Sequence, residues 1–282
     1  MQLHSINAGK FKLDGGAMFG VVPRVLWEKL NPPDENNLCT WALRCLLVEH
    51  QERRILIDTG IGTKQDQKFM SHFHPHGDHT LTGSLAQLGY TPDDITDVFL
   101  THLHFDHCGG ALRRNEAGEI VPTFPNAVYW TNARHYDWAI APNPRERASF
   151  LRENIVPLAE HGVLQFIDEE QHTSWLDGIR VFFAYGHTEA MMIPLISIGN
   201  QTVAFCADLL PSSMHVRMPY VMSYDVRPLQ TLKEKQAFFD EAIAADYILF
   251  LEHDPVTECI RIGKNDRGRI EIVQRGTLAE ML

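Results

Sequence analysis

A six-residue motif at the end of an expected strand restricts most strongly how this chain can fold. The stretch THLHFDHCGG, which begins at Thr101, contains H-x-H-x-D-H and so gathers three imidazoles and a carboxylate. The segment DVFLT that leads into it is short and largely apolar, as expected of a buried strand. In an extended segment residues i and i+2 point to the same side, so His102 and His104 can converge on one ion. Asp106 and His107, past the bend, would face a second ion.

The same pattern occurs a second time, earlier in the chain. This copy consists of His74, His76, Asp78 and His79. It is interrupted by proline and glycine and leads directly into a helical pattern, for which Asp78 or Thr80 would be the N-cap. We therefore expect an exposed loop at the entry of a helix, with an accessory metal site as the alternative.

Six residues cannot complete the coordination shells of two ions, so further ligands must come from elsewhere in the chain. Three residues that follow expected strands are candidates: His187 after RVFFAYG, Asp208 after TVAFCA, and His253 after YILFLE. Taken singly, each is more simply explained as a capping or hydrogen-bonding group. Together with HLHFDH, in this order and spacing, they indicate a metal site with several ligands.

The combined pattern resembles the metallo-β-lactamase superfamily, from the DTG at Asp58 through HLHFDH and GHT to His253. The resemblance implies a histidine triad on one metal, a mixed triad on a second metal, and a bridging carboxylate: His102, His104 and His187; Asp106, His107 and His253; and Asp208. Asp58 matches a position that orients the ligands from behind them. The implied cofactors are two divalent metal ions. Zinc suits the His and carboxylate ligands, and Mn, Fe or Co stay open.

The resemblance also implies a fold. It is an α+β, four-layer αβ/βα sandwich of two mixed sheets flanked by helices, in a single domain over residues 1–282. Apolar residues make up 44% of the chain and no linker interrupts them, which favours one domain. Hydrophobic patterning predicts helices at 80–88, 133–140, 145–161 and 229–245, strands at 19–22, 43–49, 97–101 and 126–130, and hairpins at 194–210 and 260–273.

Within the superfamily, the segment LDGGAMFGVVP and the order of elements are most similar to the quorum-quenching N-acyl-homoserine lactonase-like branch. The resemblance implies a hydrolase that opens a lactone ring with a hydroxide bridging the two metals. Enzymes of that branch often carry a tyrosine three residues after the bridging aspartate, where this chain has Pro211. Tyr220 and Tyr224 are the candidates for that catalytic role, unless the substrate differs. Asp106 is a candidate to carry the proton to the leaving group.

Two other functions stay open. One is a phosphotriesterase or arylesterase that uses the same metals, since the Lewis-acid chemistry is shared. The other is a metal-binding protein without catalysis.

The charge balance disfavours some partners. The chain has 25 Lys and Arg against 36 Asp and Glu, a formal net charge of −11, which works against binding a nucleic-acid backbone. A small ester or lactone is the expected partner, and a homodimer is left open. No apolar run approaches the roughly 20 residues that span a bilayer, so we expect no membrane association and a cytoplasmic protein. Five widely spaced cysteines predict neither a disulfide framework nor a cysteine zinc finger.

Overall fold

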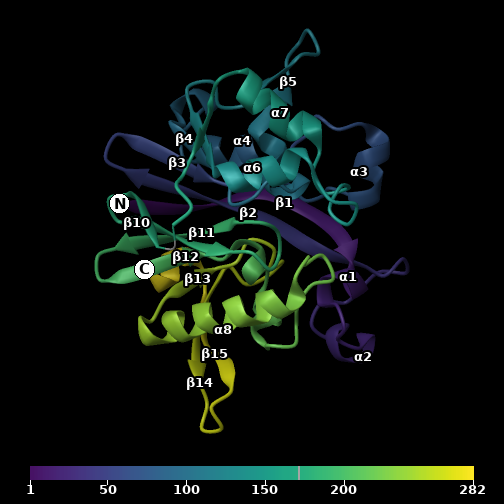
Figure 1. The fold of residues 1–282 in the computed structure, drawn as a ribbon, viewed down its shortest axis with the longest axis vertical. Helices are drawn as coiled ribbons and strands as arrows, with labels where there is room; N and C mark the ends of the chain where they lie inside the picture. The colour runs from purple at the N-terminus through teal and green to yellow at the C-terminus, as the bar shows by residue number, and fades with distance from the viewer. Residues whose placement is uncertain (171) are drawn as a thin grey trace. The chain divides into compact units, whose positions relative to one another are not determined.

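The computed structural model describes residues 1–170 and 172–282, which divide into two compact units (Figure 1). Unit 1 comprises Met1–Gly9 and Leu43–Glu170; unit 2 comprises Lys10–Ala42 and residues 172–282. Strands β1 (Gln2–Asp14) and β2 (Leu38–His50) contribute residues to both units. That residues 1–282 form one domain stays a prediction.

Unit 1 is built on a mixed sheet. Among the described residues its strand order is β1-β2-β3-β4-β7-β8, with β2 and β3 antiparallel and β3, β4, β7 and β8 parallel. Parallel neighbours need crossover connections, which the helices of this unit supply. The elements are β3 (Arg53–Ile57), α3 (Gln67–Phe73), α4 (Leu81–Gln87), η1 (Pro92–Asp94), β4 (Asp97–Phe99), α5 (Phe105–Cys108), η2 (Gly109–Ala111), β5 (Leu112–Arg114), β6 (Ile120–Pro122), β7 (Val128–Thr131), α6 (Ala133–Ile140), α7 (Arg152–Glu160) and β8 (Leu164–Phe166).

Unit 2 is built on a second sheet. Its strand order in the described chain is β15-β14-β13-β12-β11-β10-β9, antiparallel throughout except for the parallel pair β12 and β13. The connection between that parallel pair runs through α8, which packs along β14. The elements are α1 (Gly15–Phe19), α2 (Arg24–Trp27), β9 (Thr173–Leu176), β10 (Ile179–Ala184), β11 (Met191–Ile198), β12 (Gln201–Phe205), η3 (Ala207–Leu209), η4 (Ser213–Val216), α8 (Pro228–Ala244), β13 (Ile248–Phe250), β14 (Cys259–Lys264), β15 (Ile270–Gly276) and α9 (Leu278–Met281).

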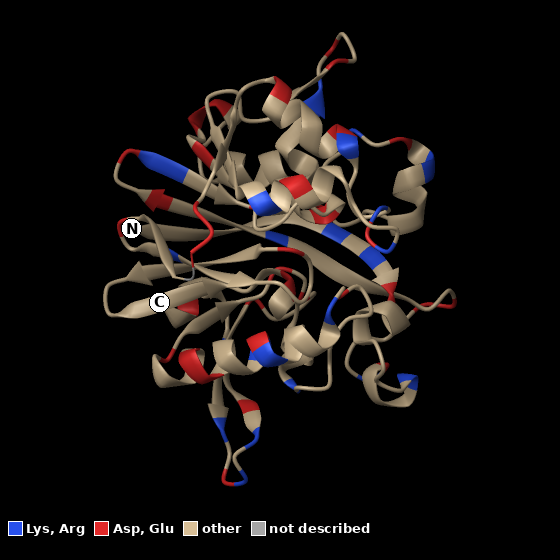
Figure 2. Ribbon diagram, in the orientation of Figure 1, with Lys and Arg blue, Asp and Glu red and all other residues tan. Residues whose placement is uncertain are grey.

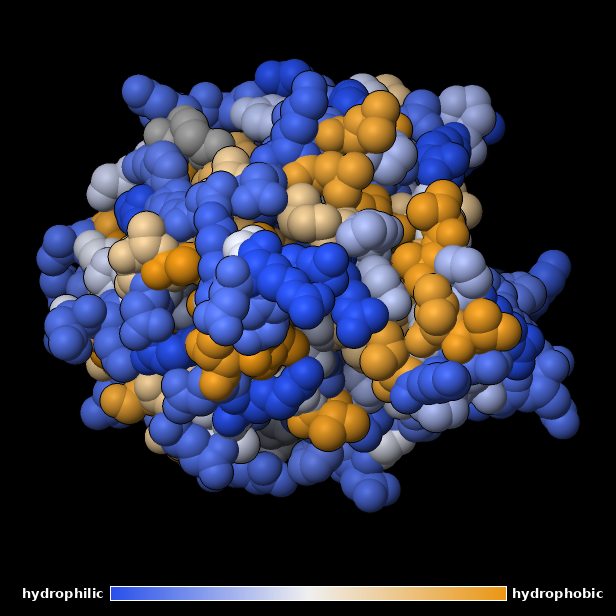
Figure 3. Space-filling view, turned by 90° about the horizontal axis from the view of Figure 1, so that it is seen from below, coloured by the Kyte–Doolittle hydropathy of each residue, from blue (hydrophilic) through white to orange (hydrophobic). Residues whose placement is uncertain are grey.

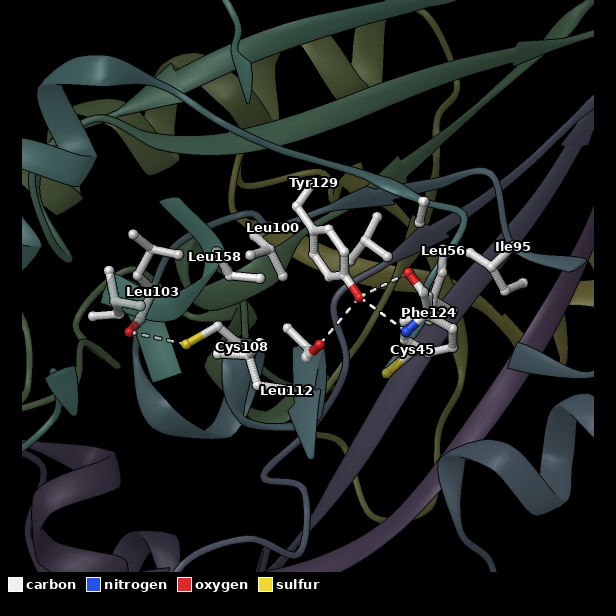
Figure 4. Close-up of a cluster of buried hydrophobic side chains, with 14 of the residues drawn as sticks. Cys45, Leu56, Ile95, Leu100, Leu103, Cys108, Leu112, Phe124, Tyr129 and Leu158 are labelled. Carbon is white, nitrogen blue, oxygen red and sulfur yellow. Dashed lines mark hydrogen bonds between the residues drawn. The ribbon is translucent and has the colours of Figure 1, made fainter. Parts of the chain in front are cut away.

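The apolar core of unit 1 includes residues of the HLHFDHC segment itself. Leu103 and Cys108 are buried in one cluster with Tyr129, and the Cys108 thiol donates to the Leu103 carbonyl at 3.3 Å (Figure 4). The Tyr129 hydroxyl donates to Ala111 O at 3.1 Å and accepts from the Phe124 N–H at 3.0 Å. Burial raises the pKa of the Cys108 thiol to about 12, so it is a packed, protonated thiol. The apolar positions of the motif thus anchor its polar ones.

Two glycines after the motif allow backbone to pack directly on backbone. The Gly110 N–H donates to Gly60 O at 3.0 Å. A Cβ on Gly109 would lie 2.1 Å from Ile61 O, and one on Gly110 would lie 2.2 Å from Thr59 O. Because the obstacle in both cases is main chain, it cannot rotate out of the way, and only glycine fits.

Most predicted elements are confirmed. The helix expected at 133–140 is α6, the helix expected at 229–245 is α8, and both hairpins are present. Thr80 is the N-cap of α4, and its side chain accepts from Gly83 N.

Two expectations fail, and one strand was missed. Residues 19–22 are not a strand: α1 ends at Phe19, and the Asp14 side chain caps that short helix by accepting from the Ala17 N–H. The helix predicted at 145–161 begins only at Arg152, because Asn143 holds the preceding residues in a turn by accepting from the Arg145 N–H. Strand β1 was not predicted, since it lacks a regular two-residue alternation of buried and exposed positions.

Charged residues of both signs are spread over the elements (Figure 2). On the face shown in Figure 3, apolar residues form separate groups among hydrophilic ones. No helix in the described part of the chain is both long and apolar enough to cross a membrane.

We predict that Gly109→Ala lowers the free energy of unfolding by about 3 kcal/mol, because the new Cβ must displace the main chain at Ile61. The control is Gly118→Ala, where nothing lies within 4 Å and only the positive φ of 82° is unfavourable, at about 1 kcal/mol. Urea unfolding of both variants checks the difference. Equal losses would contradict the packing argument.

Candidate metal centre

The HLHFDH motif of unit 1 forms two adjacent ligand pairs. Nε2 of His102 lies 3.1 Å from Nδ1 of His104, so the two rings point lone pairs toward one position. Helix α5 then turns the chain, and Oδ2 of Asp106 lies 3.8 Å from Nε2 of His107. All four side chains are buried. The strand end followed by a bend therefore produces the two pairs that the spacing predicts.

Asp58 sets the tautomers of two of these histidines. At the end of β3, its buried carboxylate accepts from the Thr101 N–H at 2.8 Å, the Thr101 hydroxyl at 2.6 Å and His107 Nδ1 at 3.0 Å. Since the Thr101 hydroxyl gives its hydrogen to Asp58, it accepts from Nδ1 of His102 at 3.1 Å. Both histidines are then left with an unprotonated Nε2, the form that binds a cation. Asp58 has a φ of 57°, in the left-handed region that residues other than glycine seldom adopt.

In unit 2, one aspartate lies between two histidines. Oδ2 of Asp208 is 3.1 Å from Nε2 of His187, and Oδ1 is 3.2 Å from Nε2 of His253. The opposite nitrogens donate outward: His187 Nδ1 to Asp225 Oδ1 at 2.9 Å, and His253 Nδ1 to Ala42 O at 2.8 Å. Each oxygen of Asp208 thus faces a different histidine, as a bridging ligand would.

Electrostatics in this second cluster favour a positive charge. Burial opposes the charged form of His187, but Asp208 and Asp225 outweigh burial and raise the pKa of His187 to about 10. A proton and a metal ion would compete for the same Nε2 position. Imidazole nitrogens and carboxylate oxygens are the donors that zinc and similar divalent ions take, so both clusters fit a metal site.

Helix α8 and the residues before it hold the GHT loop in place. The Val226 N–H donates to the His187 carbonyl at 3.1 Å. Glu234 accepts from the backbone N–H of Gly186 at 2.9 Å, and Arg227 pairs with Glu189 at 2.5 Å. Sequence reasoning missed these supporting residues, because neither the positions of α8 nor the residues before it show in the sequence which loop they will contact.

His215 is a structural residue of unit 2. It is buried, its Nε2–H donates to Met18 O at 2.9 Å, and its Nδ1 lies 2.7 Å from the Ser212 hydroxyl. Its ring stacks on Phe19 with centroids 5.0 Å apart and planes 3° from parallel. Burial lowers the pKa of His215 to about 4, so the ring is neutral at pH 7.

The two candidate tyrosines differ in their surroundings. Tyr220 is 6% exposed, and its ring lies edge-on to Phe19 at 6.1 Å. Its carbonyl accepts from the buried Nζ of Lys235 at 3.0 Å. Tyr224 is half-buried. Of the two, Tyr224 has the more accessible side chain.

The second copy of the motif is an exposed loop, as expected. His74, His76, Asp78 and His79 are all exposed, and His76 Nδ1 bonds to the His74 carbonyl at 2.8 Å. Within the part of the chain that the structure describes, no three potential ligands gather there. The two copies share the sequence pattern H-x-H-x-D-H. A loop with proline and glycine does not fix the side chains of the second copy as a strand end does.

The family is established by comparison with known proteins. Residues 44–245 match the family described as the metallo-beta-lactamase superfamily. The chain therefore belongs to this superfamily, has its fold of mixed sheets flanked by helices, and is a metal-dependent hydrolase.

Its similarity to individual proteins is lower. A probable metallo-hydrolase of Mycobacterium tuberculosis is 28% identical over 244 residues, 76% of each chain. An N-acyl homoserine lactonase of Bacillus thuringiensis is 25% identical over 234 residues, 78% of this chain and 80% of its own. Among solved structures, a probable metal-dependent hydrolase from Staphylococcus aureus has a TM-score of 0.86 at 29% identity, covering 97% of this chain and 95% of its own. The dizinc quorum-quenching lactonase AidC has a TM-score of 0.79 at 21% identity, covering 98% and 95%; at that identity the likeness is one of fold.

We predict that burial of Lys235 makes stability depend on pH. Burial lowers the pKa of Lys235 to about 7 from an ordinary 10.5, so folding favours the neutral amine. The resulting destabilisation is complete below pH 7 and disappears as pH rises toward 10.5. The unfolding free energy of the wild type minus that of Lys235→Met should therefore rise between pH 7 and 10, by at most about 1.4 kcal/mol per pH unit. Chemical unfolding across this range measures it, and a difference that does not change with pH would contradict it.

Proposed function

We propose that the two ligand clusters together form one dinuclear metal centre that opens the ring of a lactone such as an N-acyl-homoserine lactone. The proposed ligands are those of both units: His102, His104, Asp106, His107, His187, Asp208 and His253. Asp58 would orient His102 and His107 from behind. The observation that supports a metal centre most strongly is the arrangement of proton donors: His102, His107, His187 and His253 each direct Nδ1 to an oxygen acceptor and keep Nε2 for a ligand role.

Two divalent ions, most simply zinc, would lower the pKa of a bound water toward neutrality and polarise a carbonyl oxygen. The residues of this chain would hold that chemistry in place. Asp208 would take the bridging position, because its two oxygens already face two different histidines. Asp106, the carboxylate of the motif, would return a proton to the departing oxygen. No serine or cysteine nucleophile is required.

A group of aromatic rings beside the motif favours a substrate with an apolar part. The Phe105 ring, inside HLHFDH, contacts Phe73 at a centroid distance of 4.4 Å and Phe69 at 5.3 Å. Both partners come from α3, where Phe69 and Phe73 are half-buried, so these two rings stay within reach of a ligand. An acyl chain would gain about 25 cal/mol for each Å² of apolar surface removed from water there. The lactonase from Bacillus thuringiensis is the relative that suggests the reaction.

We predict metal-dependent hydrolysis of acyl-homoserine lactones. The reaction is measured by the proton that each opened ring releases. Chelation should abolish it and zinc should restore it. His253→Ala should lower kcat/KM by at least about 100-fold, because it removes one of the proposed ligands. The matched control is His79→Ala, in the exposed copy of the motif, which should leave activity and metal content unchanged.

The same assay is run with an aryl ester and with a phosphotriester in place of the lactone. Faster turnover of either would favour the alternative esterase or phosphotriesterase. If none of these substrates is hydrolysed in a metal-dependent reaction, the proposed hydrolytic function is contradicted. Equal loss from His253→Ala and His79→Ala would contradict the proposed ligand set.

We predict that Tyr224→Phe lowers kcat roughly 100-fold with little change in KM, as loss of a donor to a developing oxyanion does. Tyr220→Phe should have a small effect, because its ring is packed edge-on against Phe19. Steady-state kinetics of both variants on the same lactone tests this. If neither variant changes kcat, no tyrosine takes the catalytic role.

A further inference from the structure

The segment 143–150, between α6 and α7, lies against the HLHFDH motif of unit 1. The Phe105 N–H donates to the Ser149 carbonyl at 2.9 Å, and the Phe150 ring lies 4.7 Å from the His104 ring. Glu146 is 2% exposed, and its Oε1 lies 3.6 Å from His104 Nε2. The buried carboxylate of Glu146 therefore faces Nε2 of His104, while His102 faces Nδ1 of the same ring.

His104 would bind a metal through Nδ1, whereas the other proposed histidine ligands would bind through Nε2. Its Nδ1 lies 3.1 Å from His102 Nε2, so Nε2 is the outward nitrogen and must carry the proton when Nδ1 acts as a ligand. The other four histidines have their outward nitrogen bonded to an oxygen, of Thr101, Asp58, Asp225 or Ala42. Glu146 is placed to be the corresponding acceptor for His104.

Two further contacts of Glu146 show which of its oxygens faces the histidine. Its Oε2 accepts from Trp138 Nε1 at 2.8 Å and from Asn143 Nδ2 at 2.5 Å. An ionised carboxylate only accepts, so it can receive these donors on one oxygen and an imidazole N–H on the other. A glutamine cannot do both, because its NH₂ group would have to face a donor on one side or the other.

We propose that Glu146 is a positioning residue that holds His104 in its metal-binding tautomer and raises the basicity of Nδ1. The inference rests on the proposed metal centre. At 3.6 Å the contact is longer than a hydrogen bond, so the carboxylate would act by its charge and by accepting a hydrogen bond from the Nε2–H when the ring binds a cation.

The test measures metal binding rather than turnover alone. Zinc affinity of the purified full-length protein is determined by competition with a chromophoric chelator, and the cobalt-loaded protein is followed by its d–d absorption. Glu146→Gln should weaken zinc binding 10- to 100-fold at one of the two sites and shift the cobalt spectrum. The control is Glu160→Gln, an exposed glutamate on α7, which should match the wild type in both.

A second variant separates positioning from folding. Trp138→Phe leaves the Glu146 carboxylate in place but removes one of the hydrogen bonds that orient it, so it should weaken zinc binding by a smaller factor, about threefold. Wild-type zinc affinity and an unchanged cobalt spectrum in Glu146→Gln would overturn the inference while leaving the metal centre intact. If Glu146→Gln does not fold, unchanged affinity in Trp138→Phe overturns it. A wild-type protein that binds no zinc would instead overturn the proposed centre, and this inference with it.

Discussion

The ligand arrangement of unit 1 depends on one buried carboxylate, that of Asp58. It accepts two hydrogen bonds from Thr101 and one from His107, and through the Thr101 hydroxyl it also fixes His102. A buried anion is unfavourable unless it is fully bonded, and these hydrogen bonds satisfy the Asp58 carboxylate inside unit 1. The close backbone packing at Gly109 and the apolar anchors of the motif keep its donors at these distances.

Unit 2 also combines buried carboxylates with histidines, but in another arrangement. Asp208 lies between the Nε2 atoms of two histidines, whereas Asp58 of unit 1 lies on the Nδ1 side of His107. Asp208 faces His187 and His253, and Asp225 stabilises His187 from the other side. Such clusters are poor contributors to stability in themselves, since desolvating charges costs about as much as pairing them gains. A bound cation would offset the charge of the carboxylates in each cluster.

The sequence predicts the part of the site that depends on local geometry. A strand end places His102 and His104 side by side whatever surrounds it, and the superfamily pattern gives His187, Asp208 and His253 as the further candidates. Side chains that contact the motif from distant segments could not be found in this way. Glu146 lies in a stretch that the sequence predicts as helix, but the chain turns there, with the Asn143 side chain accepting from the N–H groups of Arg145 and Glu146. Strand β1 was missed for another reason, because its burial does not alternate regularly along the strand.

The central claim is that ligands from both units share one pair of metal ions. Anomalous X-ray diffraction from crystals of the zinc-loaded protein, recorded on both sides of the zinc absorption edge, tests it most directly. The account predicts two anomalous peaks about 3.5 to 4 Å apart, both within bonding distance of Asp208. A single peak, or two peaks in which the HLHFDH histidines and His253 bind widely separated ions, would contradict it.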